Sequence, residues 1–302
     1  MDWLRLRFKG LKAAQVEPLQ ELLEGLGALA STVEDQADDP VLEPAPGETP
    51  LWPESQVTAL FSDQQDSLAL ILALQQQLPV PTMTHLPQWS AELLEDQVWT
   101  QAWMTDYHPI QCGDRLWICP SWTAPPDANA VNLMLDPGLA FGTGTHPTTA
   151  LCLRWLDQQA SAQKLQGQSV LDYGCGSGIL AIAALLLGAA VAVGVDIDPQ
   201  AIQASVDNAQ RNHVEAVFMT VTDGLPDTSF DTLVANILAQ PLIDLAPQLC
   251  HHLKPGGMLA LSGLIEAQVE LVMAAYMPYC DDFLVTLDSG WAIITGRRRM
   301  DS

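Results

Sequence analysis

Basic residues are scarce in this chain of 302 amino acids. It contains 12 Lys and Arg against 36 Asp and Glu, a formal net charge of −24. Residues 13–114 contain no Lys or Arg, although they hold seventeen acidic residues. A field of that sign repels phosphate backbones and anionic lipid and attracts cationic partners. We therefore expect a basic protein as partner and neither nucleic acid nor a membrane; solubility or a salty habitat is the alternative explanation of the charge.

Metal-binding and targeting signals are also missing. The six cysteines form no Cys-x-x-Cys pair and have no His at ligand spacing, which argues against a disulfide framework and a metal site. The first residues lack the layout of a signal peptide, and the most apolar run, 180–195, is interrupted by Gly188 and Gly194. The sequence thus predicts a cytoplasmic protein without a bound metal.

The length favours two domains, and the first is expected at residues 1–86. Apolar residues alternate at strand spacing or recur at helical spacing along this part. The predicted elements are strand 3–8, helix 13–26, strands 28–33 and 56–61, helix 67–78 and strand 80–85. This βαββαβ order is typical of a ferredoxin-like α+β domain. Residues 38–50, rich in proline, are expected to form an exposed loop.

Residues 87–128 contain five of the nine tryptophans. We expect a linker helix over 91–105 and then an extended connection that packs on the second domain. Such a density of Trp favours packing between domains, and a recognition surface is the alternative.

Residues 129–302 are expected to form an α/β domain. The predicted strands are 169–173, 190–195, 215–221, 230–235, 258–262, 282–287 and 291–296, and the predicted helices are 178–187, 199–212, 240–253 and 267–276. Several strands are apolar on both faces, as in a parallel sheet covered by helices. The last two strands are separated by a short turn, so one of them must be antiparallel. This pattern predicts a Rossmann-like, seven-stranded methyltransferase domain.

A glycine-rich turn joins the first strand of this domain to the next helix. Gly174, Gly176 and Gly178 allow a sharp turn and close approach of a ligand. The dinucleotide fingerprint requires Gly where this chain has Ile179, which disfavours a pyrophosphate cradle and an NAD-dependent dehydrogenase. Asp196 ends the second strand, where its carboxylate can accept hydrogen bonds from both ribose hydroxyls. These features together favour S-adenosylmethionine as the cofactor.

Asn236 ends the fourth predicted strand, at the edge where open α/β sheets bind ligands. Methyltransferases that act on bases often carry an aromatic residue shortly after this position, and here Ile237 and Leu238 follow instead. An aliphatic amine is therefore the favoured methyl acceptor, with Asn236 orienting it; capping of the next helix is the alternative role. Asp198 is expected to cap the helix that starts at Pro199.

Residues 135–149 combine three glycines with four threonines just before a helix. With this segment in view, the chain closely resembles the bacterial methyltransferases of protein eleven of the large ribosomal subunit. The resemblance covers nearly the whole chain and depends on these motifs: Pro46–Thr49, Leu116–Trp122, Leu135–Thr149, Asp172–Gly178, Gly194–Ile202, Asn236–Ala239 and Leu253–Gly257. Residues 160–166 are longer than the family pattern, which should alter only a surface connection.

The resemblance implies an S-adenosylmethionine-dependent enzyme that methylates several lysines and the α-amino group of a basic ribosomal protein. It also implies that the ferredoxin-like domain binds this protein and that the linker is mobile. Cofactor contacts are expected from Thr149, Gly174, Asp196 and Asn236, and the glycine-rich motifs add Gly176, Thr143 and Phe141. His146 is expected to be structural rather than a base.

We expect a monomer. The alternatives are an enzyme of the same fold acting on a small molecule or nucleic acid, and a non-catalytic nucleotide-binding or scaffold protein. Measuring the binding of S-adenosylmethionine would distinguish a methyltransferase from the second alternative.

Overall fold

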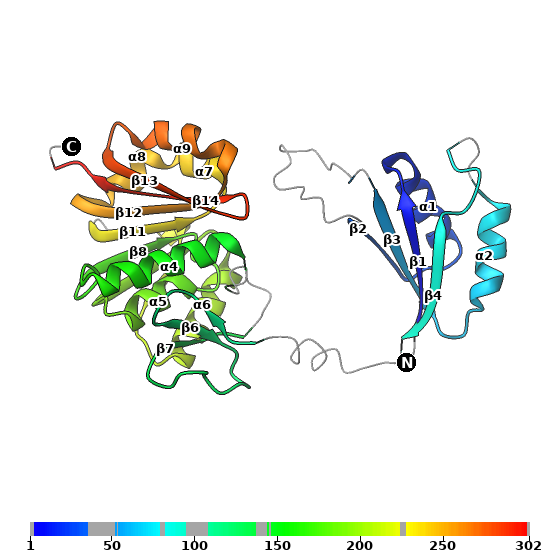
Figure 1. The fold of residues 1–302 in the computed structure, drawn as a ribbon, viewed down its shortest axis with the longest axis horizontal. Coiled ribbons are helices and arrows are strands. Elements are labelled where there is room, and N and C mark those ends of the chain that lie inside the picture. The colour runs from blue at the N-terminus through cyan, green and yellow to red at the C-terminus, as the bar shows by residue number, and fades with distance from the viewer. Residues whose placement is uncertain are drawn as a thin grey trace. The chain divides into compact units, whose positions relative to one another are not determined.

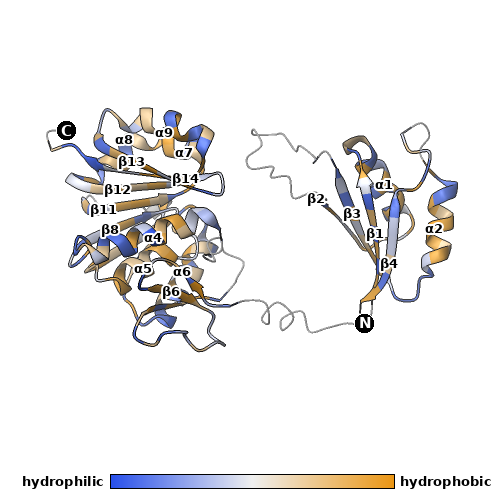
Figure 2. Ribbon diagram, in the orientation of Figure 1, coloured by the Kyte–Doolittle hydropathy of each residue, from blue (hydrophilic) through white to orange (hydrophobic). Residues whose placement is uncertain are grey.

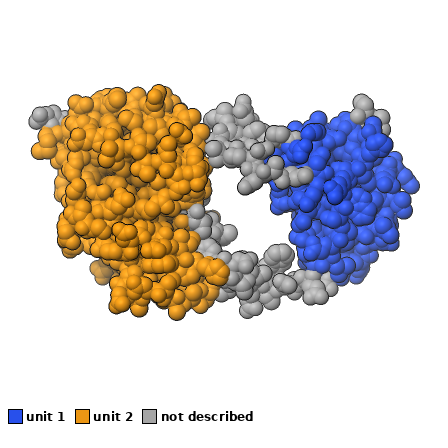
Figure 3. Space-filling model, viewed as in Figure 1, with its two compact units in different colours: residues 1–106 blue, residues 107–302 orange. Residues whose placement is uncertain are grey.

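The computed structural model describes residues 3–35, 52, 54–78, 82–94, 108–136, 144, 146–223 and 228–300 of the chain. The chain forms two compact units, residues 1–106 and residues 107–302 (Figure 3). The hydrophobic core of the first unit is separate from the two cores of the second. Each unit therefore carries a fold of its own.

The first unit has the predicted βαββαβ order, which is compatible with a ferredoxin-like fold. Its strands form one sheet in the order β2-β3-β1-β4, and every strand pairing is antiparallel. The elements are β1 (Trp3–Leu11), α1 (Ala13–Gly25), β2 (Ala30–Asp35), β3 (Ser55–Ser62), α2 (Ser67–Gln76) and β4 (Gln88–Leu94) (Figure 1).

Both helices pack on the same face of this sheet because β1 alternates strictly. Leu4, Leu6 and Phe8 are buried in the core that α1 and α2 cover. Arg5 and Arg7 point to the opposite face and are only half-buried. Full burial of a large apolar side chain contributes about 1.5–3 kcal/mol, so these residues determine which face of the sheet the helices cover.

The strand predicted at residues 80–85 is wrong, because residues 82–87 form no strand and the fourth strand is β4, Gln88–Leu94. The linker helix predicted over 91–105 is wrong for residues 91–94, which belong to β4; its remaining residues lie outside the described ones. β4 is an edge strand and is mostly exposed, so its side chains do not alternate clearly. Pairing with β1 overrides the helix preference of Ala91, Glu92 and Leu93. The expected boundary at residue 86 therefore falls inside the first unit.

The second unit contains the predicted seven-stranded sheet, in the order β10-β9-β8-β11-β12-β14-β13. The strands are β8 (Ser169–Tyr173), β9 (Val191–Asp196), β10 (Val217–Thr220), β11 (Phe230–Asn236), β12 (Leu253–Ile265), β13 (Cys280–Asp288) and β14 (Trp291–Arg298). Strands β8 to β12 run parallel, and β14 is antiparallel to both β12 and β13. The terminal hairpin thus places the antiparallel strand that the sequence predicted.

Helices cover both faces of this sheet. Val170 lies in a core with α4 and α5, whereas its neighbour Leu171 lies in the core with α7, α8 and α9. The helices are α4 (Pro147–Ser161), α5 (Ile179–Leu186), α6 (Pro199–Arg211), α7 (Ala239–Asp244), α8 (Ala246–His251) and α9 (Val269–Tyr276), with short 3-10 turns η1 (Val221–Asp223) and η2 (Glu266–Gln268). Hydrophobic colouring dominates α5 and the central strands (Figure 2). Such a sheet leaves only its edges for ligands.

Two details differ from the predicted pattern. The helix expected over 240–253 is divided into α7 and α8 at Leu245, two residues before Pro247. Proline lacks the N–H that a continuing helix would need. A small sheet of β5 (Ile110–Gln111), β6 (Leu116–Cys119) and β7 (Val131–Met134) packs into the core of the second unit. None of the helices in the described part of the chain is long and apolar enough to cross a bilayer.

Candidate active site

The glycine-rich turn lies between β8 and α5, as predicted. Gly174, Gly176 and Gly178 have φ values of +78°, +52° and +77°, in the left-handed region that favours glycine. A Cβ atom on Gly174 would lie 2.2 Å from Cγ2 of Ile237, which follows β11. The turn is therefore shaped by both its backbone conformation and its close approach to the end of β11.

Asp196 lies against this turn at the end of β9. Its Oδ2 accepts a hydrogen bond from the backbone N–H of Gly176 at 2.9 Å, and its Oδ1 accepts one from the N–H of Asp198 at 3.0 Å. A carboxylate has further lone pairs, so both oxygens retain capacity for a ligand. Asp198 caps α6 as predicted, because its Oδ1 accepts from the N–H of Gln200 at 2.8 Å.

Helix α6 supports the turn through residues that the sequence analysis missed. Ser205 Oγ donates to the carbonyl of Gly176, and Asn208 Nδ2 donates to the carbonyl of Ser177, both at 2.9 Å. Both side chains are buried. Their spacing of three residues puts them on one helix face, and small or polar residues on an otherwise buried face were the available signal.

Asp172 was also missed as a site residue. Its side chain is fully buried in β8, and Oδ2 accepts from the N–H of Ala181 at 3.0 Å. Oδ1 has no hydrogen-bond partner among the described residues. The pKa of Asp172 is raised to about 7, mainly by burial and in smaller part by the nearby charge of Asp196, while the hydrogen bond from the N–H of Ala181 acts in the opposite direction. A carboxyl in a strand that is apolar on both faces is costly, and that cost was the signal in the sequence.

Asn236 and Thr149 meet at the end of β11. Asn236 Nδ2 donates to Thr149 Oγ1 at 3.3 Å, and Thr149, in the first turn of α4, is almost fully buried. The Oδ1 of Asn236 is buried and has no hydrogen-bond partner in the described part of the chain. An acceptor left unpaired in this way costs about 1–3 kcal/mol, so its place marks where a donor on a ligand would be stabilised.

His146 precedes α4 and acts as its N-cap. Its Nδ1 accepts from the N–H of Thr148 at 3.4 Å and lies 2.8 Å from the hydroxyl of Thr148. The imidazole also packs edge to face against the indole of Trp291, with ring centroids 4.7 Å apart. Burial lowers the pKa of His146, which suits a neutral acceptor at a helix N-terminus. These contacts support the structural role expected for His146.

Two of the predicted cofactor contacts, Phe141 and Thr143, lie outside the described residues. Of the same segment, Gly144 is described: its φ is +85°, and an added Cβ would lie 2.1 Å from Cδ1 of Ile118. Gly144 therefore fits tightly against β6. The structure brings together Gly174, Gly176 and Asp196 on one side, and Thr149 and Asn236 on the other.

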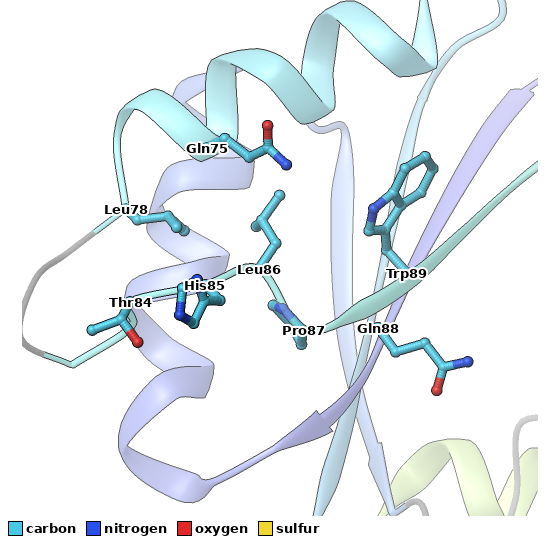
Figure 4. A pocket seen from close by; sticks show the side chains of 8 residues that line it. All are labelled: Gln75, Leu78, Thr84, His85, Leu86, Pro87, Gln88 and Trp89. Carbon is cyan, nitrogen blue, oxygen red and sulfur yellow. The ribbon is translucent and has the colours of Figure 1, made fainter.

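A hollow of about 590 Å³ lies in the first unit, away from the glycine turn. Its lining comes from the end of α2 and from the segment leading into β4: Gln75, Leu78, Thr84, His85, Leu86, Pro87, Gln88 and Trp89 (Figure 4). This lining contains no carboxylate and no Lys or Arg. It therefore lacks the charged partners that surround the glycine turn.

The sheet order, the terminal antiparallel strand, the turn and the strand-end Asp and Asn together define a Rossmann-like methyltransferase. The family model "Ribosomal protein L11 methyltransferase (PrmA)" matches residues 2–299. The chain belongs to this family.

Individual relatives agree with this result. A ribosomal protein L11 methyltransferase of Hahella chejuensis is 50% identical over 299 residues, which cover 99% of each chain. One of Pseudomonas aeruginosa is 50% identical over 303 residues, which cover 100% of each chain. The solved structure of a ribosomal protein L11 methylase from Lactobacillus delbrueckii subsp. bulgaricus matches with a TM-score of 0.57 and 34% identity, covering 64% of this chain and 100% of that one.

Proposed function

We propose that this chain transfers methyl groups from S-adenosylmethionine to lysine side chains and to the α-amino group of ribosomal protein L11. The names of its relatives suggest the substrate. The observation that carries the chemistry is the unpaired Oδ1 of Asn236, held by Thr149 at the edge of the sheet. An oxygen acceptor there suits the N–H of an attacking amine.

The charges around the turn fit the proposed cofactor. S-adenosylmethionine, when bound, supplies a methyl group on a positively charged sulfonium. The carboxyl groups of Asp172 and Asp196 flank the turn, and Asp172 Oδ1 lacks a partner among the described residues. A pyrophosphate would be repelled by the same charges. We assign cofactor contacts to Phe141, Thr143, Thr149, Gly174, Gly176, Asp196 and Asn236.

The acceptor amine must be neutral to react. For a lysine with an ordinary pKa, removing the proton at pH 7 costs about 4.6 kcal/mol, from 3.4 pKa units at about 1.36 kcal/mol each. Burial beside a positive charge lowers this pKa, so no dedicated base is needed. S-adenosylmethionine, when bound, would supply the methyl group and leave as the neutral thioether, and the acceptor nitrogen would release its proton to water. Asn236 accepts an N–H of the amine and so orients the lone pair.

The residues after Asn236 favour an aliphatic acceptor. Ile237 packs against the glycine turn, and the side chain of Leu238 is 57% exposed. Neither offers the flat surface on which a base could stack. A lysine side chain, with four methylene groups, needs only an apolar wall.

Replacing Asn236 tests the proposal directly. In Asn236→Ala, methylation of L11 is expected to fall about a hundredfold in kcat, since removing a single oriented polar contact in an active site has effects of that order. Mass spectrometry of L11 after incubation with labelled cofactor measures the products. Asn129→Ala is the control, because Asn129 is exposed in a loop. Unchanged turnover in Asn236→Ala would remove its assigned role.

We further infer a division of labour in which the first unit holds the substrate protein and the second performs the transfer. The separate core of the first unit and its excess of acidic residues support this assignment. We expect the enzyme to act as a monomer in the cytoplasm on protein rather than on nucleic acid. Sedimentation of the purified chain, with and without RNA, would check both the oligomeric state and the lack of RNA binding.

A further inference from the structure

The sheet of the first unit has one face that α1 and α2 do not cover. Arg5, Arg7 and Lys9 of β1 point toward it, opposite to the buried Leu6 and Phe8. We refer to this surface, formed by the outward side chains of β1 to β4, as the open sheet face. Strand pairing places Arg7 between Thr58 of β3 and Ser90 of β4, and Arg5 between Leu60 and Glu92.

Unpaired polar atoms occur in two places in the described part of the chain. Two of them, Asp172 Oδ1 and Asn236 Oδ1, belong to the candidate active site. The other three are buried on the open sheet face: Arg5 Nε, Arg7 Nε and Thr58 Oγ1. A buried polar group without a partner destabilises the folded protein. Their concentration on one surface, as at the active site, indicates a ligand that supplies the missing partners.

The charge of this face is opposite to that of its surroundings. Residues 1–114 contain four basic residues, and three of them, Arg5, Arg7 and Lys9, lie here. Arg5 pairs with Glu92, but neither Arg7 nor Lys9 forms an ion pair in the described part of the chain. The exposed face of α1, by contrast, carries the acidic residues Glu17, Glu21 and Glu24. Arg7 also acts on the carboxylate of Glu92, since both arginines lower its pKa. The three cations of β1 outnumber this neighbouring carboxylate and therefore suit a further anionic group.

A hollow of about 150 Å³ lies beside these cations. Arg5, Ala30, Thr32, Thr58, Leu60 and Leu94 line it. It is mostly apolar except for the arginine and the two threonines, and it is large enough for one aliphatic side chain. A ligand that fits both features carries a carboxylate next to an aliphatic group.

We propose that the open sheet face docks a segment of the methyl-accepting protein in which a carboxylate lies next to an aliphatic side chain. This inference rests on the proposed function. The carboxylate binds the guanidinium of Arg7, and the aliphatic side chain enters the hollow next to Leu60. RNA fits less well, because Trp3 is the only aromatic residue on the open face of the central strands β1 and β3 and therefore offers little surface on which bases could stack.

Steady-state methylation of purified L11 by the full chain at about 0.15 M salt tests this assignment. Arg7→Gln is expected to raise KM for L11 about tenfold, as the loss of one hydrogen bond to a charged group does, without changing kcat or cofactor affinity. The rise should shrink at high salt. Lys12→Gln is the matched control, because Lys12 is exposed and pairs with Glu54; its KM should stay within about twofold of wild type.

The variant Thr58→Val distinguishes an effect on substrate docking from an effect on folding stability. Removal of an unpaired hydroxyl should leave thermal stability equal or higher, and yet KM for L11 should rise because the ligand loses a partner. If the wild type methylates L11 and both Arg7→Gln and Thr58→Val keep its KM, the docking proposal is overturned. The same holds if Arg7→Gln alters only RNA binding or self-association. If the wild type does not methylate L11, the proposed function fails instead.

Discussion

The two sheets of this protein present ligands with different surfaces. The seven-stranded sheet is covered by helices on both faces, and its unpaired polar atoms lie in Asp172 and Asn236, at the carboxyl ends of its strands. The four-stranded sheet is covered on one face, and its unpaired atoms lie in the middle of the other. Covered parallel sheets thus confine recognition to an edge suited to a small molecule, whereas a half-covered antiparallel sheet leaves a surface suited to a protein.

The largest effect is expected at the edge of the seven-stranded sheet. Asp196→Ala should weaken binding of S-adenosylmethionine about a thousandfold, since hydrogen bonds to a charged group contribute about 1.5–3 kcal/mol each and two ribose hydroxyls are involved. Calorimetric titration of the full chain measures this. Asp207→Asn, on the exposed side of α6, is the control and should bind normally. Equal affinity in Asp196→Ala would disprove a cofactor site at this edge.

The second-largest effect is expected when the first unit is removed. A chain that starts at residue 107 retains both cores of the second unit, so it should bind the cofactor within about threefold of the full chain. Its kcat/KM for L11 should fall about a hundredfold, equivalent to about 2.7 kcal/mol of lost substrate binding. Methylation rates over a range of L11 concentrations check this. A shortened chain with full activity on L11 would contradict the division of labour.

The sequence predicted the second unit better than the first. The bounds of β8 match the prediction, because Gly174 ends it abruptly and its residues are apolar on both faces. Asp196 and Asn236 were predicted to lie at one edge because strand ends in such a sheet fall there, and in the structure they are the last residues of β9 and β11. β4 was missed because an edge strand is held by backbone pairing and has little reason to alternate. The contributions of Ser205 and Asn208 depend on three-dimensional contacts between α6 and the turn, which no local pattern contains.

The open sheet face could not be predicted for a related reason. Alternation in β1 indicates that Arg5 and Arg7 share a face, but it does not reveal that Thr58 lies opposite Arg7. That neighbour depends on the pairing of β1 with β3 across a gap of about fifty residues. Unpaired atoms are a property of the packed structure, so they become visible only when the register is known.

The smallest effect concerns the pH dependence of the buried carboxyl. In the folded protein the pKa of Asp172 is raised to about 7 by burial, from an ordinary value of 3.8. The folded state therefore binds more protons than the unfolded state between these pH values, and this group's contribution to stability falls as pH rises from about 4 to about 7. Asp172→Asn, which imitates the neutral acid, should gain stability relative to wild type across this window. Denaturant unfolding at pH 4, 6 and 8 measures the difference.

Asp157→Asn is the matched control for this experiment. Asp157 is equally buried in the same unit, but its oxygens accept from the N–H groups of Asp114 and Arg115 and from Arg115 Nε. Its replacement should therefore destabilise the protein at pH 8, where Asp172→Asn stabilises it.

Cofactor binding should show the opposite pH trend, because a cationic ligand favours the ionised carboxyl of Asp172. With a pKa of about 7 in the free enzyme, wild-type affinity should rise about tenfold from pH 6 to pH 8. The affinity of Asp172→Asn should stay flat and should be the lower of the two at pH 8. Calorimetry at both pH values tests this trend. If the wild-type affinity does not depend on pH, Asp172 does not contribute to cofactor binding. Asn236 would then be the buried group with an unpaired atom that indicates a ligand site at this edge. The open sheet face, which contains no buried acid, should show no comparable change over the same range.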